Sequence, residues 1–249
     1  MSTKAISTGS HNLNSILGGR GIESGAVTQF YGQPASGKTQ ICHCIATIVT
    51  QSKFYGGLGA KVLYVDTEGT FRSERTQQIA EARGFDLDDT FNNIIVADVN
   101  SLWEQETIVK NAESNIVPQS IKVLIIDSII NHFKAEYSER SMLAERQHRL
   151  NVMMHILQKI ARTYGIAVVI TNQVQHEPDA YANYRSEPTP LGGYVLAHAS
   201  THILRLRPSG DRRTAKIVKS PSYPVVDAKF SFDETGITDP EEMRCRRKL

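Results

Sequence analysis

Short apolar runs alternate with longer segments of helical periodicity along the first two thirds of the chain. The runs are rich in Val, Ile and Leu, a composition typical of buried strands. They lie at residues 27–31, 61–66, 93–97, 122–127 and 166–171. Because strands that alternate with helix-length crossovers favour parallel pairing, we expect an α/β fold with a mostly parallel central sheet covered by helices.

The clearest helix covers residues 143–164. Its apolar side chains recur at helical spacing, which predicts one buried face, and its methionines are expected to fill the core. The residues on that face are Leu143, Leu150, Met153, Met154, Leu157, Ile160 and Ala161.

The pattern changes after residue 200. Short strands are predicted at residues 201–207, 213–219 and 228–232, with "PSGD" as a hairpin turn between the first two. We expect these strands to extend the sheet in antiparallel fashion. The polar segment 175–190 before them has little periodicity, and a loop of this length in a compact domain is usually functional or disordered.

Composition limits the function classes. With 249 residues, of which 40% are hydrophobic, the chain can bury one sizeable core, so we expect a single domain over residues 1–249. No stretch approaches the ~18 consecutive apolar residues of a membrane span, and the start lacks a secretion signal, which favours a soluble, intracellular protein without a membrane partner. Three cysteines without metal spacing favour a reduced compartment, with Cys42 and Cys44 as packing residues.

Charge alone does not indicate a nucleic-acid partner. The formal net charge is only +2, and much of the positive charge falls late, in "RLRPSGDRR" and "RCRRKL". The stronger chemical signal is a motif between the first long strand and the following helix.

This motif, Gly32-x-x-x-x-Gly37-Lys38-Thr39, has the spacing of a phosphate-binding loop. Its small residues let backbone N–H groups converge on a polyphosphate, and the following helix directs its positive end there. Lys38 would reach the β- and γ-phosphates of ATP, and the Thr39 hydroxyl would ligate magnesium. The predicted nucleotide-binding loop comprises Gly32, Gln33, Pro34, Ala35, Ser36, Gly37, Lys38, Thr39 and Gln40.

Two acidic residues follow other predicted strands. In "KVLIIDS", Asp127 stands at the carboxyl end of a strand, where a second magnesium ligand is expected beside Thr39. In "VLYVDTEG", Glu68 could orient the attacking water. An ordinary strand-end aspartate and a solvated turn are the alternative interpretations of these two residues.

Motifs along nearly the whole chain together resemble the ATPase core of archaeal RadA and its eukaryotic recombinase relatives. They are "ISTGSHNLNSILGGRGIESGAVTQFYG", "DTEGTFRSER", "AEYSERSMLAERQ", "VVITNQV", "LGGYVLAHAS", "SPSYP" and "AKFSFDETGI", in that order. The resemblance implies a RecA-like P-loop ATPase fold that uses ATP and magnesium. Members of that family form filaments on single-stranded DNA and exchange it into homologous double-stranded DNA during recombinational repair.

The resemblance also implies roles for individual residues. Glu68 becomes the water-activating carboxylate, and Arg75 the arginine that stacks on adenine, as a planar guanidinium can. Gln173 would sense the γ-phosphate and act in catalysis with Glu68 and Lys38. His198 would lie near the second DNA loop and couple it to the nucleotide. A buried strand-end amide and a core histidine are the alternatives for Gln173 and His198.

DNA would be bound by two loops, residues 137–146 and the polar segment 175–190. Arginines suit phosphate contacts, and aromatic side chains suit stacking on bases without reading sequence. The candidate DNA contacts are Arg140, Arg146, Tyr181, Tyr184 and Arg185. A solvated surface is the alternative for either loop.

The chain departs from the family pattern in two regions. The first loop carries Ser138-Glu139-Arg140-Ser141 where the family usually has a glycine-rich turn, which adds a negative charge. The family's N-terminal helical domain and its Phe-x-x-Ala polymerisation linker are not found in the sequence. We therefore expect a monomer or weak oligomer, able to self-associate through the ATP interface. The docking groove around residues 90–125 would be open to partners that carry Phe-x-x-Ala.

A third departure is Lys219, which stands where the family usually has an acidic residue. In the family, this segment caps the ATP of a neighbouring protomer and a monovalent cation bridges the acid to the γ-phosphate. Lys219 would supply that charge covalently, and Pro224 would pack over adenine. In a single protomer, Lys219 is expected to face water.

Three functions remain open at this stage. The first is a DNA-dependent ATPase that acts as a recombinase or its core, located in the cytoplasm of an archaeon or the nucleus of a eukaryote. The second is a short RadB-like paralogue that loads filaments, or an isolated ATPase domain that binds Phe-x-x-Ala peptides without forming filaments. The third is another RecA-fold machine, such as a ring helicase.

Overall fold

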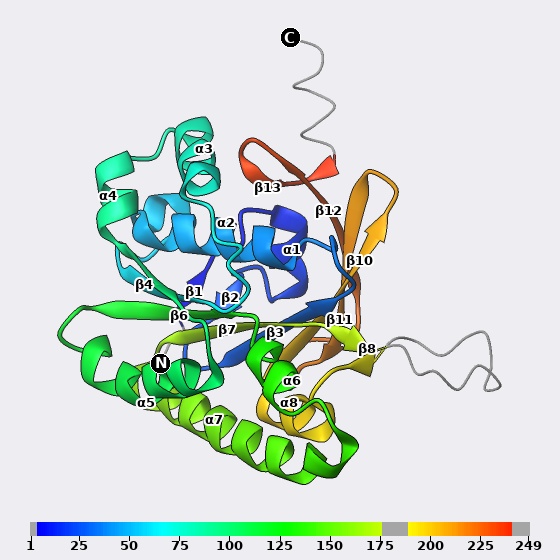
Figure 1. Cartoon of the computed structure of the whole chain (residues 1–249). Helices are drawn as coiled ribbons and strands as arrows, with labels where there is room; N and C mark the ends of the chain where they lie inside the picture. The colour runs from blue at the N-terminus through cyan, green and yellow to red at the C-terminus, as the bar shows by residue number, and fades with distance from the viewer. Residues whose placement is uncertain (1–3, 176–188, 241–249) are drawn as a thin grey trace.

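A nine-stranded sheet forms the centre of the molecule (Figure 1), seen here in a computed structural model that describes residues 4–175 and 189–240. The strand order is β13-β12-β11-β10-β3-β7-β6-β4-β5. The bounds are β3 (Val27–Gly32), β4 (Lys61–Asp66), β5 (Ile94–Asp98), β6 (Ile121–Asp127), β7 (Ala167–Asn172), β10 (His202–Ser209), β11 (Arg212–Lys219), β12 (Asp227–Asp233) and β13 (Gly236–Thr238). Neighbours from β10 through β5 pair in parallel, and those from β10 through β13 pair antiparallel. The predicted fold class is therefore confirmed.

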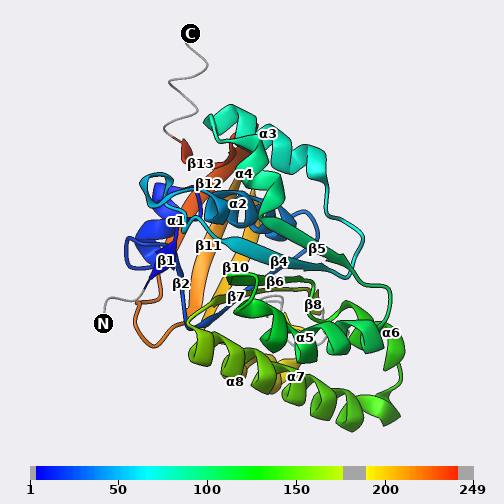
Figure 2. The same ribbon diagram turned by 90° about the vertical axis from the view of Figure 1, so that its left-hand side faces the viewer.

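Helices cover both faces of this sheet (Figures 1 and 2). One layer contains α1 (His11–Ile16), α2 (Lys38–Thr50), α3 (Ser73–Arg83) and α4 (Leu87–Asn92). The other contains α5 (Leu102–Ile116), α6 (Asn131–Glu136), α7 (Leu143–Tyr164) and α8 (Gly193–Ala199). The short elements are β1 (Ala5–Ile6), β2 (Ile22–Glu23), β8 (Val174–Gln175), β9 (Thr189–Pro190) and the 3₁₀ turns η1 (Lys53–Tyr55) and η2 (Arg140–Met142).

The helices on each face of the sheet pack against it and bury a separate hydrophobic core. Strand β6 shows why, because Val123 and Ile125 pack into one core and Leu124 and Ile126 into the other. Successive strand residues point to opposite faces, so a strand buried on both faces needs a continuous apolar run. Each fully buried aliphatic side chain contributes about 1.5–3 kcal/mol relative to an exposed one.

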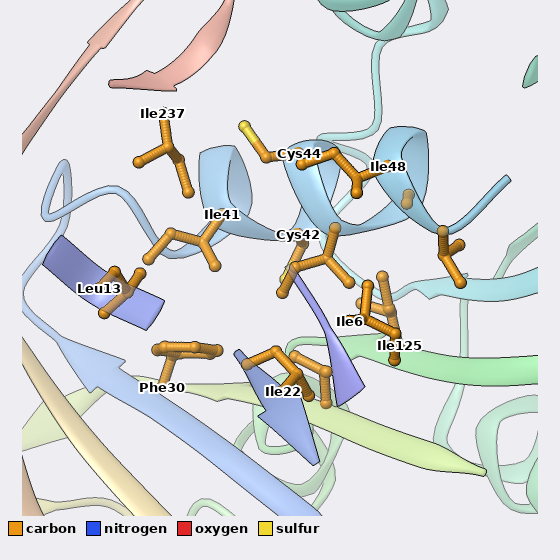
Figure 3. Close-up of a cluster of buried hydrophobic side chains, with 14 of the residues drawn as sticks. Ile6, Leu13, Ile22, Phe30, Ile41, Cys42, Cys44, Ile48, Ile125 and Ile237 are labelled. Atoms are coloured by element: carbon orange, nitrogen blue, oxygen red, sulfur yellow. The ribbon is translucent and has the colours of Figure 1, made fainter. Parts of the chain in front are cut away.

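The core under α2 contains both cysteines of that helix (Figure 3). Cys44 points toward Ile237 of β13, and a Cβ added at Gly236 would lie 2.5 Å from its sulfur. Burial raises the pKa of Cys44 to about 11 and raises that of Cys42 as well. Both thiols therefore pack as neutral apolar groups, as predicted.

The predicted elements agree closely with the observed ones. Helix α7 has the predicted bounds, and Met153 and Met154 are buried. The predicted strands are all present, with ends displaced by at most two residues. The largest difference is at the hairpin, where β10 continues through Pro208 and the turn shrinks to Gly210 and Asp211. Strand β3 ends opposite Leu206, so no parallel neighbour requires the N–H that Pro208 lacks.

Among the residues that the structure describes, no helix is both long enough and apolar enough to cross a bilayer.

Candidate active site

The predicted phosphate loop joins β3 to α2, and two of its glycines are required by their surroundings. Gly37 precedes α2 with φ +101°, a left-handed conformation that favours glycine. A Cβ at Gly37 would lie 2.4 Å from Cε2 of Phe232, and a Cβ at Gly32 would lie 2.4 Å from the backbone oxygen of Leu206. The loop backbone thus lies directly against the backbone of β10 at Gly32 and against the Phe232 ring of β12 at Gly37.

Lys38 folds back over this loop. Its Nζ donates hydrogen bonds to the backbone oxygens of Gly32 (2.9 Å) and Gln33 (3.0 Å). Burial lowers the pKa of Lys38, while the nearby carboxylates of Asp127 and Glu68 oppose that shift. The ammonium therefore lies between the loop and two acidic groups.

Asp127 ends β6 and is buried. Its Oδ2 accepts a hydrogen bond from the Tyr64 hydroxyl at 2.8 Å, and its Oδ1 accepts one from the Thr171 hydroxyl. The Thr39 hydroxyl hydrogen-bonds to the same carboxyl group. Burial raises the pKa of Asp127, and these hydrogen bonds counter the shift by stabilising the carboxylate.

Glu68 lies just after β4 and is exposed. Its Oε1 accepts hydrogen bonds from the Ser128 hydroxyl (2.6 Å) and from Nε2 of Gln173 (2.9 Å). Glu68 and Gln173, for which the sequence predicts related roles, thus meet in the structure just after the ends of β4 and β7. Ser128 was not predicted, and its only sequence signal is that it directly follows Asp127.

Arg75, the predicted adenine-stacking residue, lies on α3 beside the first turn of α2. Its Nε donates to Oε1 of Gln40 at 2.8 Å, and its Nη2 donates to the backbone oxygen of Asp233 at 2.7 Å. Its guanidinium also hydrogen-bonds to Gln78. Arg75 therefore links α2, α3 and the C-terminal strand β12 at one side of the loop.

A cavity of about 310 Å³ opens on the phosphate loop. Its lining includes Lys38, Thr39 and Glu68, together with Arg213 of β11 and Phe232 of β12. Sequence analysis did not identify the last two. The strand register brings these two residues together. Arg213 pairs with Phe230, and Phe232 lies two residues further along β12 and therefore on the same face of the sheet.

The residues of this cavity fit a nucleoside triphosphate with magnesium. The loop leaves no room for a Cβ at Gly32 or Gly37, and its buried Ser36 hydroxyl has no hydrogen-bond partner among the described residues. Thr39 and Asp127 offer the oxygen ligands that magnesium prefers when phosphates complete its shell. No cluster of three or more metal-binding His, Cys, Asp or Glu side chains occurs in the described residues.

The predicted DNA contacts are only partly described. Tyr181, Tyr184 and Arg185 lie outside the described residues, and Arg140 begins the turn η2. Arg146 lines a cavity of about 690 Å³ between the first loop and α8, and its buried Nε has no partner among the described residues.

The opposite wall of that cavity contains an aromatic residue that sequence analysis did not select. Tyr194 of α8 is 84% exposed and stacks on His198 at a centroid distance of 6.0 Å. Glu139 lines the same cavity, so the negative charge noted in the sequence lies close to Arg146.

The expectation that Lys219 faces water in a single protomer is wrong. Its Nζ donates to three backbone oxygens at the end of α8, those of Ala197 (2.6 Å), His198 (3.1 Å) and Ser200 (2.9 Å). An ammonium is favourable there because carbonyl groups at a helix C-terminus carry partial negative charge. Burial lowers the pKa of Lys219.

The segment after Lys219 is anchored to the sheet. The Ser220 hydroxyl lies 3.0 Å from Nδ1 of His202, and Tyr223 stacks on the His202 ring at 5.3 Å. Nε2 of His202 lies 2.8 Å from a carboxylate oxygen of Glu23. Pro224 follows this anchored segment and is exposed.

The comparison with known protein families agrees with this arrangement. The family model described as Rad51 matches residues 2–240, which include the phosphate loop, the acidic residues at the strand ends and the C-terminal strands. Such a match extends far beyond a single nucleotide-binding motif. The chain belongs to the Rad51 family, whose defining unit is a RecA-like recombinase ATPase core.

Proposed function

We propose that the chain is the catalytic core of a DNA recombinase that hydrolyses ATP when it is bound to single-stranded DNA. The observation that carries this proposal is the hydrogen bond from Gln173 to Glu68. Gln173 immediately precedes β8, which leads into the second DNA loop, so the bond joins that loop to the group proposed to activate water. DNA binding and hydrolysis would then be coupled through one side chain.

The residues around the loop have distinct roles in this proposal. Lys38 neutralises the β- and γ-phosphates, and Thr39 with Asp127 holds magnesium. Glu68 accepts the proton of the attacking water while Ser128 and Gln173 hold its carboxylate in place. ATP supplies the phosphoryl group, and magnesium supplies further neutralisation of its charge. Arg75 stacks on the adenine.

The DNA side of the proposal uses the two loops. Arg140, Arg146 and Arg185 would contact phosphates, and Tyr181 and Tyr184 would stack on bases. Such contacts do not read sequence, as expected for a protein that pairs any single strand with a homologous duplex. His198 would report loop occupancy, because its ring stacks on Tyr194, which lines the 690 Å³ cavity, and its backbone oxygen accepts a hydrogen bond from Lys219.

Assembly would place segment 219–224 over the ATP of a neighbouring protomer, with Pro224 as a capping residue and Lys219 as another once its ammonium leaves the carbonyl groups at the end of α8. The contacts of Ser220 and Tyr223 with His202 support this role, because they hold the segment in one conformation before any neighbour arrives.

A second candidate function is docking to recombinase partners that carry a Phe-x-x-Ala peptide. Strand β5 is the last strand of the sheet, and its Val96 is 40% exposed. Ile95 and Ala97 of β5 and Ile108 of α5 are partly buried apolar residues beside it. An open edge strand with apolar neighbours suits an extended peptide with hydrophobic anchors.

ATP turnover measured with and without single-stranded DNA tests the main proposal. We expect DNA to stimulate turnover in the wild-type chain, with light scattering reporting assembly on the DNA. Turnover that DNA does not change would contradict the proposed coupling. A Phe-x-x-Ala tetrapeptide that shifts resonances of β5 and α5 would support docking, whereas an unchanged spectrum and melting temperature would count against it.

A further inference from the structure

Arg213 lies inside β11, far along the chain from the phosphate loop, yet both line one cavity. The register of the antiparallel strands explains this position. Arg213 pairs with Phe230, so its side chain is on the same face of the sheet as those of Phe230 and Phe232. Phe230 is buried in the core under α2, and Phe232 lies against Gly37.

The guanidinium of Arg213 is incompletely paired. Its Nη1 donates to the backbone oxygen of Arg212 at 2.9 Å. Its Nε is buried, and no atom of the described residues accepts a hydrogen bond from it. Buried N–H groups in folded proteins normally have partners, and an exception at a cavity calls for an explanation, which a ligand bound in that cavity would provide.

The ligand that suits this group is an anion. Arginine presents donors in a rigid planar fork that matches phosphate oxygens, and it stays charged at every relevant pH. Lys38 and the N-terminus of α2 border the same cavity, so three sources of positive potential converge there.

We propose that Arg213 is a further nucleotide-binding residue, whose guanidinium binds phosphate oxygens of the nucleotide held by its own protomer. This inference rests on the proposed nucleotide site. It assigns to the C-terminal antiparallel strands a direct part in binding, with Phe232 closing the cavity beside Gly37 and Arg213 supplying charge. A single protomer then holds its nucleotide with cations from two distant parts of the sequence.

Arg212 provides a matched control, because it is adjacent on β11 and its side chain is on the opposite face of the strand. Dissociation constants for ATP and ADP are measured by isothermal titration with the wild-type chain, Arg213→Gln and Arg212→Gln. We expect Arg213→Gln to raise the dissociation constants for ATP and ADP at least about ten-fold, as for loss of hydrogen bonds to a charged group. Arg212→Gln should stay within about two-fold of the wild type, since its side chain does not reach the cavity.

Two further measurements separate charge from shape. Arg213→Lys keeps the charge and loses the fork, so its affinity should fall between wild type and Arg213→Gln. Raising the salt concentration should reduce the difference between wild type and Arg213→Gln, because salt screens an electrostatic contact. Unfolding temperatures of the nucleotide-free proteins show whether the variants keep the fold.

Equal affinities of Arg213→Gln and wild type, or equal losses in both glutamine variants, would overturn the inference. A loss that is independent of salt and also seen with adenosine would assign Arg213 to the base instead. Lys38→Ala distinguishes a failure of the proposed nucleotide site from a failure of the role of Arg213 alone. If neither wild type nor Lys38→Ala binds ATP, the nucleotide site itself fails, whereas binding by wild type and by Arg213→Gln alike rejects only the role of Arg213.

Discussion

The parallel and antiparallel parts of the sheet contribute to the candidate active site in different ways. In the parallel part, functional side chains directly follow strands, as Lys38 follows the loop after β3, Glu68 follows β4 and Gln173 follows β7. The carboxyl ends of parallel strands share one edge, so such residues meet there. In the antiparallel part, Arg213 and Phe232 lie within strands and reach the cavity through the face they share.

Asp127 and Arg213, one from each part, also differ in how their polar atoms are paired. In the parallel part, Asp127 has hydrogen bonds from Tyr64, Thr171 and Thr39, and burial raises the pKa of Tyr64 so that its hydroxyl stays protonated. In the antiparallel part, the Nε of Arg213 has no partner within the described residues. Asp127 in the parallel part is thus held by hydrogen bonds from the protein itself, whereas Arg213 in the antiparallel part, like Ser36 of the phosphate loop, keeps a buried polar atom without a partner among the described residues.

The strongest test of this division is Lys38→Ala in the parallel part. We expect ATP binding to be lost and hydrolysis to fall at least about a hundred-fold, because the phosphates lose a directly bound cation. Titration calorimetry and a phosphate-release assay measure the two effects. Lys53→Ala, at an exposed turn, is the control. Unchanged nucleotide affinity and turnover in Lys38→Ala would contradict the assignment of residues 32–39 as a phosphate-binding loop.

Glu68→Gln should separate chemistry from binding. We expect nucleotide affinity to stay within a few-fold of wild type, while hydrolysis falls about a hundred-fold or more because an amide cannot accept the proton of water. Single-turnover hydrolysis of bound ATP measures the loss. Glu74→Gln, at an exposed position on α3, is the control. Wild-type turnover in Glu68→Gln would move the role of the base to another group.

Acid should destabilise the parallel part of the sheet before it destabilises the antiparallel strands. Burial lowers the pKa of His43 on α2 from 6.5 to about 4, helped by the positive charges of Arg75 and Arg72 and opposed by Asp66. The unfolded chain then binds a proton between those pH values that the folded chain does not. Stability is complete above about pH 6.5 and decreases as the pH falls toward 4, by about 2 kcal/mol at pH 5.

Urea unfolding at pH 7 and pH 5 measures this effect, and hydrogen exchange locates it on α2 rather than on β11 and β12. His43→Gln should remove most of the pH dependence, whereas His155→Gln, at an exposed position, should leave it unchanged. A pH profile that is the same in wild type and His43→Gln would refute the assignment.

Lys219→Asp should have the smallest effect of these variants. We expect the free energy of unfolding to fall by about 1–2 kcal/mol, because the substitution replaces an ammonium at the end of α8 with a carboxylate. It should also make DNA-stimulated ATPase activity depend on potassium, while wild-type activity should be similar in potassium and sodium at equal ionic strength. Lys216→Asp, on the same strand, is the control. Strong potassium activation of the wild-type chain would disprove the idea.

Sequence reasoning predicted the placement of residues best where the pattern is local. The phosphate loop is one continuous segment, and the positions of Asp127 and Glu68 follow from apolar runs that end in an acid. The position of Arg213 at the cavity could not be read in this way, because "RR" within a strand does not say which arginine faces the loop. That choice depends on pairing with Phe230, a long-range contact. The capping of α8 by Lys219 was missed for a similar reason, since only the folded chain brings these residues together.

Sheet order has a consequence for protein synthesis. Strand β3, which begins the phosphate loop, lies between β7 and β10, and the residues of β10 that pair with it are 202–206. A ribosome at about 5–20 residues per second therefore makes the loop roughly 8 to 33 s before the second neighbour of its strand exists. Until β7 is made, the apolar β3 can contact only incorrect partners or chaperones, and after that it has a correct neighbour on one side alone. Truncated nascent chains that end before β10 should therefore be sensitive to protease and unable to retain ATP.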